Sequence, residues 1–217
     1  MKKILHQAIS LLAPIVLVLA GGNAEATSIS AFAYDNATVM PSGPRTGDNG
    51  KRFFNMEGRD NGDFSAFGVA DLQFCHPTNE PLGTSATLTV ALVQANTFFT
   101  HDGSLHFWLS TDITTDIQPS EDPAVRFILT DDPDGLAGQL APRFFLGSGE
   151  FIAGDSGQVD SFTFPLSNEA LSYLQGQIQS GGPARIVISP SNHDVAATYA
   201  GYSNEDFPGP MITVSTP

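Results

Sequence analysis

The sequence predicts an all-β protein, an antiparallel β-sandwich (jelly-roll-like) with one short helix, preceded by a signal peptide that is cleaved. Two observations lead to this prediction. Short segments that alternate apolar and polar residues recur along the chain, separated by clusters of Gly, Pro, Asn and Asp. In one later segment the apolar residues repeat at helical spacing instead. No linker rich in Pro, Ser or Gly divides the chain, so we expect a signal peptide over residues 1–26 and a single domain over residues 27–217.

The N-terminal segment has the three parts of a secretory signal. A basic start at Lys2-Lys3 precedes an apolar run from Ile9 to Ala20, and Ala24-Glu25-Ala26 places small residues where signal peptidase recognises them. The apolar run is too short to cross a bilayer, and an N-terminal core helix is the alternative interpretation. We expect a mature chain that starts at Thr27, has no membrane anchor, and is secreted to the periplasm or the medium.

Nine segments have the pattern of β-strands. They are Phe67 to Phe74, Ser85 to Val93, Ser104 to Ser110, Val125 to Leu129, Arg143 to Leu146, Ser161 to Leu166, Arg185 to Ser189, Ala196 to Tyr199 and Met211 to Val214. The first of them changes the parity of its apolar residues after Val69, which indicates either a β-bulge or a strand buried on both faces. Ahead of these strands, Asn49-Gly50 and Asn61-Gly62 predict tight hairpin turns.

The helical spacing falls within Asn168 to Gln179, where we expect the one short helix, packed across an end or edge of the sandwich. Ser167 can cap its start, and Glu169 favours the positive end of the helix dipole. Gly181-Gly182-Pro183 then ends the helix.

The charge and the cysteine content exclude some partners. With 23 acidic and 9 basic residues, the chain has a formal net charge of −14. Such a surface repels nucleic acid and anionic lipid, so nucleic acid is excluded as a partner. Cys75 is the single cysteine, so no internal disulfide can form. We expect it to be a buried, inert thiol, and a covalent dimer is the alternative.

One string of residues looks catalytic. Gly154-Asp155-Ser156-Gly157 matches the nucleophile turn of chymotrypsin-like serine proteases, but Gln158-Val159 follows it where that family has Gly-Pro. The sequence motif that carries the catalytic histidine in that family is also absent from this sequence. A tight structural turn is therefore the favoured interpretation. The histidines His76, His101, His106 and His193 have no metal-binding spacing. We therefore predict no catalytic residue.

Acidic residues suggest a cation site in one loop. Asp131, Asp132 and Asp134 lie within four residues and precede Gly135, where the chain can bend sharply. Calcium prefers several oxygen ligands in a flexible loop, so these three carboxylates are the candidate metal ligands and calcium the candidate cofactor. The alternative is an ordinary turn, which Asp-Pro-Asp-Gly also favours.

Trp108 and His106 are the candidate ligand-binding residues. By alternation they face away from Leu105, Phe107 and Leu109, which form a clean core face. An outward aromatic ring on a sheet can stack on a sugar ring. The alternative, which the general burial of aromatic residues favours, is a second core layer under a loop or the helix.

Three features from Phe67 onward resemble the DNRLRE (disaggregatase-related) group of exported β-sandwich domains. They are Ala70-Asp71-Leu72-Gln73-Phe74 followed by the strand at Thr84 to Val90, a helix running into Gly181-Gly182 and the strand Arg185 to Ile188, and Tyr202-Ser203-Asn204-Glu205 ahead of Gly209 to Val214. The chain departs from the pattern before Phe67 and in its longer, more acidic middle, Asp112 to Gly157. The resemblance implies a non-catalytic accessory module of polysaccharide-associated proteins, in which Tyr202, Ser203 and Glu205 form a structural turn.

Together these observations predict a secreted, non-catalytic domain that binds extracellular polysaccharide or cell-envelope material. Two alternatives remain open: a purely structural protein of the extracellular matrix or envelope, and a polysaccharide-active hydrolase or lyase.

If the acidic loop binds calcium, the ion should stabilise the folded protein. At a free calcium concentration of 100 Kd, the free energy of unfolding should rise by about 2.7 kcal/mol. Thermal melts with calcium and with a chelator measure this, and a variant with Asn at positions 131, 132 and 134 is the control. An unchanged melting temperature at millimolar calcium would leave an ordinary acidic turn.

Overall fold

The computed structural model describes residues 28–40, 43–44, 49–61, 66–95, 98, 100–117, 140 and 143–216. Strands dominate this part of the chain, and two short α-helices accompany them. The predicted signal peptide and the predicted strand Val125 to Leu129 lie outside the described residues. The antiparallel all-β prediction is confirmed for the rest.

The elements follow one another in the order β1 (Ser28–Met40), β2 (Gly43–Pro44), α1 (Asn49–Arg52), β3 (Phe53–Glu57), a 3₁₀ turn (Arg59–Asn61), β4 (Phe67–Phe74), β5 (Thr87–Val93), β6 (Gly103–Ser110), β7 (Arg143–Phe151), β8 (Val159–Pro165), α3 (Asn168–Ser180), β9 (Pro183–Pro190), β10 (Ala196–Ala200) and β11 (Met211–Ser215). Eight strands form one antiparallel sheet in the order β7-β6-β9-β4-β1-β11-β5-β8, and β2 pairs with β1. β10 and β3 form a second, two-stranded sheet.

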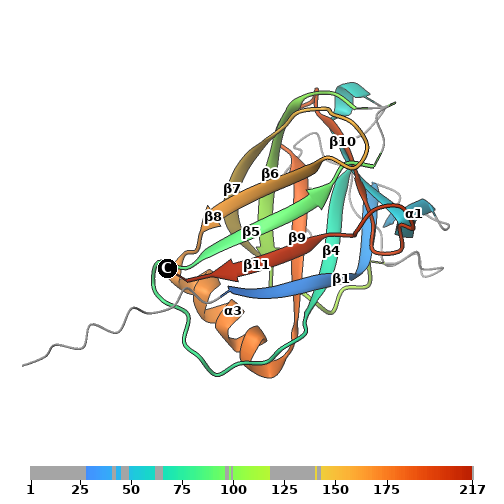
Figure 1. The fold of residues 1–217 in the computed structure, drawn as a ribbon. Coiled ribbons are helices and arrows are strands. Elements are labelled where there is room, and N and C mark those ends of the chain that lie inside the picture. Colours follow the sequence, from blue (N-terminus) through green and yellow to red (C-terminus); the bar gives the residue numbers. More distant parts are fainter. Residues whose placement is uncertain are drawn as a thin grey trace, which may run out of the picture.

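The large sheet curls until its first and last strands, β7 and β8, come into contact (Figure 1). A continuous, nearly closed barrel therefore surrounds the core, where the sequence predicted two separate facing layers. Two register shifts accompany the curl, one in β1 between Ala33 and Asp35 and one between β6 and β7 next to Phe107. An extra residue in one strand increases the local twist and bends that strand, which helps the sheet to close.

The main core lies inside the barrel, and α3 packs against it at one end (Figure 1). The buried face of α3 consists of Ala170, Leu174 and Ile178. Ser167 Oγ accepts a hydrogen bond from the Ala170 amide at 3.2 Å, and Gly181 ends the helix with a φ of 63°. The predicted helix is thus confirmed, one residue longer than expected.

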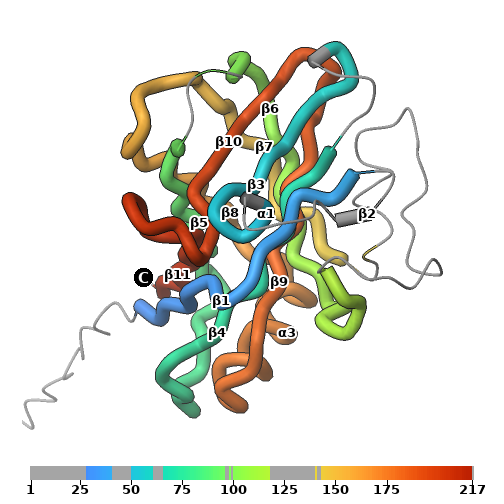
Figure 2. The backbone as a smooth tube through the Cα atoms, turned by 90° about the vertical axis from the view of Figure 1, so that its right-hand side faces the viewer, coloured from blue at the N-terminus to red at the C-terminus, as the bar shows by residue number. Residues whose placement is uncertain are grey.

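The small sheet packs on the same core from another side. Figure 2 shows β10 and β3 crossing the face of the molecule next to α1. Phe54 on β3 and Tyr199 on β10 are fully buried in the main core, with their ring centroids 6.0 Å apart. β3 was not predicted from the sequence, because its apolar run is short and follows a turn-rich segment.

Asn49-Gly50, predicted as a hairpin turn, instead begins α1. The reason is a buried side chain in β1. Asn36 Nδ2 donates to the carbonyl oxygen of Gly50 at 3.0 Å, and Asn36 Oδ1 accepts from the Tyr202 amide at 2.7 Å. The helical turn thereby brings an acceptor to a polar group that would otherwise be buried without a partner.

β4 is buried on both faces, as one of the two sequence interpretations predicted. Its Leu72 and Phe74 belong to the main core, whereas Phe67 and Val69 face outward into a second apolar cluster. The second cluster consists of Ala37, Val39, Phe67, Val69, Ile117, Leu140 and Val187, with Trp108 partly buried against it. The outer face of this half of the sheet is therefore a second core layer.

A buried ion pair lies on the same outer face. Asp71 on β4 and Arg185 on β9 are direct partners in the strand register. Arg185 Nε donates to Asp71 Oδ1 at 2.7 Å and Nη2 donates to Oδ2 at 2.8 Å. Arg185 Nη1 also donates to the carbonyl oxygens of Asp112 and Thr115, at 2.8 and 2.9 Å. Only 2% of Arg185 is exposed, and the pair joins two strands to the segment after β6.

Removing one partner of this pair should destabilise the protein strongly. Asp71→Asn leaves the buried Arg185 guanidinium without a counter-charge, so we expect a loss of about 3–5 kcal/mol in the free energy of unfolding. The double variant Asp71→Leu/Arg185→Met removes both charges and should recover part of that loss. Urea unfolding measures both, and a double variant no more stable than Asp71→Asn would contradict this account.

Candidate functional site

Aromatic side chains gather on the outer face of β6 and β7. Trp108 and Phe145 are direct partners in the strand register, with ring centroids 4.7 Å apart. His106 lies edge-on to both rings, 6.5 Å from Trp108 and 5.4 Å from Phe145. The guanidinium carbon of Arg143 lies 4.3 Å from the centroid of the Trp108 ring. We call these four residues the aromatic ledge.

Strand alternation places these side chains outward. On β6, Phe107 and its apolar neighbours point into the main core, so His106 and Trp108 point out. On β7, Phe144 and Leu146 pack toward the core, which leaves Phe145 on the outer face. The sequence prediction that His106 and Trp108 share an outward face is confirmed.

The register shift between Phe107 and Trp108 depends on a glycine of β7. Leu146 is the extra residue of β7, so Leu146 and Gly147 both point inward. A Cβ atom at Gly147 would lie 2.7 Å from the Phe164 ring, and the φ of this residue is 152°. Because residue 147 is a glycine, two successive residues of β7 can point inward while Phe145 stays opposite Trp108.

Trp108 is half-buried, and part of its ring surface is already occupied. Its ring packs against the second apolar cluster, and its Nε1 lies 3.4 Å from Ser189 Oγ, to which it donates. Arg143 stacks over the ring. Phe145 is 52% exposed and is the most accessible ring of the ledge. A ligand on this surface would therefore meet Phe145 before Trp108.

The sequence analysis missed Phe145 and Arg143. A usable signal was present, because Arg143-Phe144-Phe145-Leu146 has three consecutive apolar residues in a predicted strand, so one of them must face outward. The sequence could not show that this strand pairs with Ser104–Ser110, and it is this pairing that places Phe145 beside Trp108.

The opposite part of the sheet has a different surface. The outward positions of β1, β11, β5 and β8 form three rows across the strands: Ser28, Ser215, Thr87 and Pro165; Ser30, Thr213, Thr89 and Thr163; Phe32, Met211, Ala91 and Ser161. None of these twelve residues is charged. Phe32 is 52% exposed, the same fraction as Phe145, but it has no aromatic partner across the strands.

Asp131, Asp132 and Asp134 lie outside the described residues. Within the described part of the chain, no group of three or more His, Cys, Asp or Glu side chains could hold a metal ion. The predicted calcium site therefore stays a prediction.

Gly154-Asp155-Ser156-Gly157 is a structural turn anchored by the buried Gln94. The Gly154 amide donates to Gln94 Oε1 at 2.8 Å, and the Gly157 amide donates to the Gln94 carbonyl oxygen at 2.7 Å. Gln94 Nε2 donates to Asp160 Oδ2, which also accepts from the Tyr199 hydroxyl at 2.9 Å. Burial and the nearby Asp160 carboxylate both raise the pKa of Tyr199, so this hydroxyl stays protonated.

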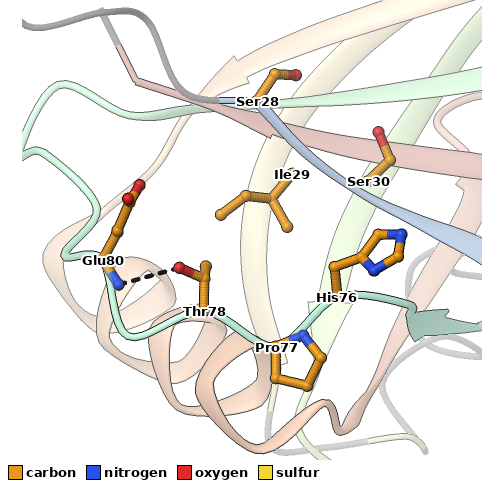
Figure 3. Close-up of a pocket in the computed structure, with 7 residues that line it drawn as sticks. All are labelled: Ser28, Ile29, Ser30, His76, Pro77, Thr78 and Glu80. Atoms are coloured by element: carbon orange, nitrogen blue, oxygen red, sulfur yellow. Dashed lines mark hydrogen bonds between the residues drawn. The ribbon is translucent and has the colours of Figure 1, made fainter.

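Cys75 is exposed, which corrects the prediction of a buried thiol. β4 ends at Phe74, so Cys75 is the first residue to leave the sheet. A shallow pocket opens nearby between the start of β1 and the segment after β4, lined by Ser28, Ile29, Ser30, His76, Pro77, Thr78 and Glu80 (Figure 3). Its volume of about 210 Å³ is below the roughly 300 Å³ at which ligand pockets usually begin.

No known family model matches the chain, and no curated protein matches it significantly. The resemblance to the DNRLRE group therefore stays a prediction, and the function must be argued from the ledge itself. Within the described residues, no helix has the length and apolar character needed to span a bilayer.

The two large rings of the ledge should differ in their contribution to stability. Trp108→Ala removes a ring packed on the second apolar cluster, so we expect a loss of about 2–3 kcal/mol, less than for a fully buried ring. Phe145→Ala should cost about 1 kcal/mol or less, since half of its surface is already in water. Urea unfolding compares them, and equal losses would contradict this assignment.

Proposed function

We propose that the protein is a secreted, non-catalytic module that binds extracellular polysaccharide through the aromatic ledge. The observation that carries this proposal is the half-exposed Phe145, held beside Trp108 and His106 on the outer face of paired strands. Large aromatic rings are mostly buried in folded proteins, so a cluster that keeps one ring in water points to a binding surface.

The geometry suits a sugar ring. An aromatic ring offers a large, stiff apolar contact that loses little conformational entropy on binding, and the C–H face of a sugar can stack on it. Strands hold side chains more rigidly than loops do, so the rings are in place before the ligand arrives. A flat ledge also leaves both ends of a long polymer free to extend past the protein.

Export and calcium belong to the same proposal. Cleavage of residues 1–26 would place the ledge where extracellular polysaccharide is found, and calcium at Asp131, Asp132 and Asp134 would stabilise the loop without contributing to catalysis. Cell-envelope material rich in polysaccharide is an equivalent partner for this surface.

Phe145→Ala should weaken binding to polysaccharide by about tenfold, because central aromatic contacts dominate such interfaces. Affinity electrophoresis in gels that contain dextran, soluble cellulose derivatives or polygalacturonate measures the change. Phe32→Ala is the matched control, since Phe32 has the same exposed fraction but lies on another part of the sheet.

Phe32→Ala should bind like the unaltered protein. No retardation in any gel would contradict the proposed function and favour a purely structural protein. Shortened polysaccharide products, found by size-exclusion chromatography, would favour a hydrolase or lyase instead.

A further inference from the structure

We infer that the aromatic ledge selects negatively charged polysaccharide, and that Arg143 is the selecting residue. This inference rests on the proposed function and names the ligand class of the same site. It depends on a cation of the ledge that has no carboxylate partner within the described part of the chain.

Arg143 stacks on Trp108 but has no acidic partner among the described residues. Its guanidinium carbon lies 4.3 Å from the Trp108 ring centroid, and its Nε is buried without a hydrogen bond. The stack holds the guanidinium at the ledge, and the ring covers its Nε side. A carboxylate or sulfate at the outer edge of the guanidinium would accept hydrogen bonds from its terminal Nη groups.

Arg185 shows the contrast on the same face. Ser110 lies between the two arginines in the strand register, as the partner of Arg143 on one side and of Arg185 on the other. Asp71 and two carbonyl oxygens accept from four of the five N–H donors of Arg185. Arg185 is therefore structural, whereas Arg143 has no carboxylate partner among the described residues, and its terminal Nη groups are the part that a ligand could meet.

Among the described residues, the carboxylates of Asp71 and Asp112 are engaged elsewhere and do not cancel the charge of Arg143. Asp71 is paired with Arg185, and the Asp112 carboxylate accepts hydrogen bonds from the amides and hydroxyls of Thr114 and Thr115. Glu150 lies seven residues further along β7, roughly 20 Å away. At physiological ionic strength charges are screened over about 8 Å, so the net charge of −14 repels a polyanion only weakly at this point.

The spacing suits an acidic sugar. Arg143 and Phe145 are two residues apart on one strand face, which places their Cα atoms about 6.7 Å apart. This separation is comparable to the length of one sugar ring. A ring stacked on Phe145 can therefore direct a carboxylate or sulfate toward Arg143, whose planar group binds such anions with two hydrogen bonds. A neutral sugar would offer no charged acceptor to that guanidinium.

The test compares two forms of one polymer backbone, polygalacturonate and its fully methyl-esterified form. The unaltered protein should bind the acidic form about tenfold more tightly or better, and added salt should reduce the difference. Arg143→Gln should abolish the preference while weak binding to the ester persists. Arg143→Lys, which keeps the charge but not the planar group, should retain part of it.

Arg52→Gln is the matched control. Arg52 is also half-buried, its Nε also lacks a hydrogen bond, and its guanidinium carbon lies 5.9 Å from the Phe53 ring, but it belongs to α1 and not to the ledge. Its substitution changes the net charge equally and should leave the preference unchanged. Circular-dichroism melts verify that each variant folds. If Arg143→Gln does not fold, Arg143→Lys is compared with the unaltered protein instead.

The outcomes separate this inference from the proposed function. If Phe145→Ala weakens binding to both polymers and the arginine variants leave the ratio unchanged, the charge selection is wrong and the polysaccharide-binding function stands. Equal affinity of the unaltered protein for both polymers leads to the same conclusion. If neither polymer nor any neutral polysaccharide binds, both proposals fail.

Discussion

Arg185 organises the outer face of the sheet because its single guanidinium joins its own strand to two other parts of the chain. Two donors bind Asp71 on the neighbouring strand, and a third binds the carbonyl oxygens of Asp112 and Thr115. The segment after β6 is thereby held down, and its Ile117 joins the second apolar cluster. Trp108 packs on the margin of that cluster. The ion pair thus supports Trp108 indirectly, through the segment that carries Ile117 into the cluster.

A buried ion pair of this kind gives specificity more than stability. Taking both charges out of water costs nearly as much as their attraction returns, and apolar replacements are often as stable. The bidentate geometry, however, fits one strand register only, since a slip of one residue would place Arg185 on the other face. The pair therefore selects one alignment of β4 and β9 among several that the apolar residues alone would tolerate.

Strands with a regular alternation of apolar and polar residues were predicted accurately from the sequence, and strands with an interrupted alternation were not. β5 and β6 keep a strict alternation and were predicted within a few residues, as was α3 with its cap at Ser167. β1 was missed, because its inward residues are odd-numbered before Tyr34 and even-numbered after it, and Asn36 is buried by hydrogen bonds that no local pattern reveals. β7 was predicted only as far as Leu146 for the same reason, a change of parity at an extra residue.

The candidate site was predictable to the same extent. Alternation was sufficient to place His106 and Trp108 together on the outward face of one strand. It could not show that a strand more than thirty positions later lies beside it with Phe145 and Arg143, because pairing between distant strands depends on the whole topology. Nor could it show that Trp108 is partly covered. The cluster on which Trp108 packs is built from residues of β1, β4 and β9 together with Ile117 and Leu140.

The curl of the sheet also determines which strand edges are exposed to other polypeptide chains. A free strand edge is a template on which another polypeptide can add a strand, and it is a common start of aggregation. Here the two outermost strands of the large sheet, β7 and β8, lie against each other. In the small sheet, β10 forms isolated β-bridges with Gln94 and His101. This arrangement leaves little free edge on the large sheet to which another polypeptide could add a strand.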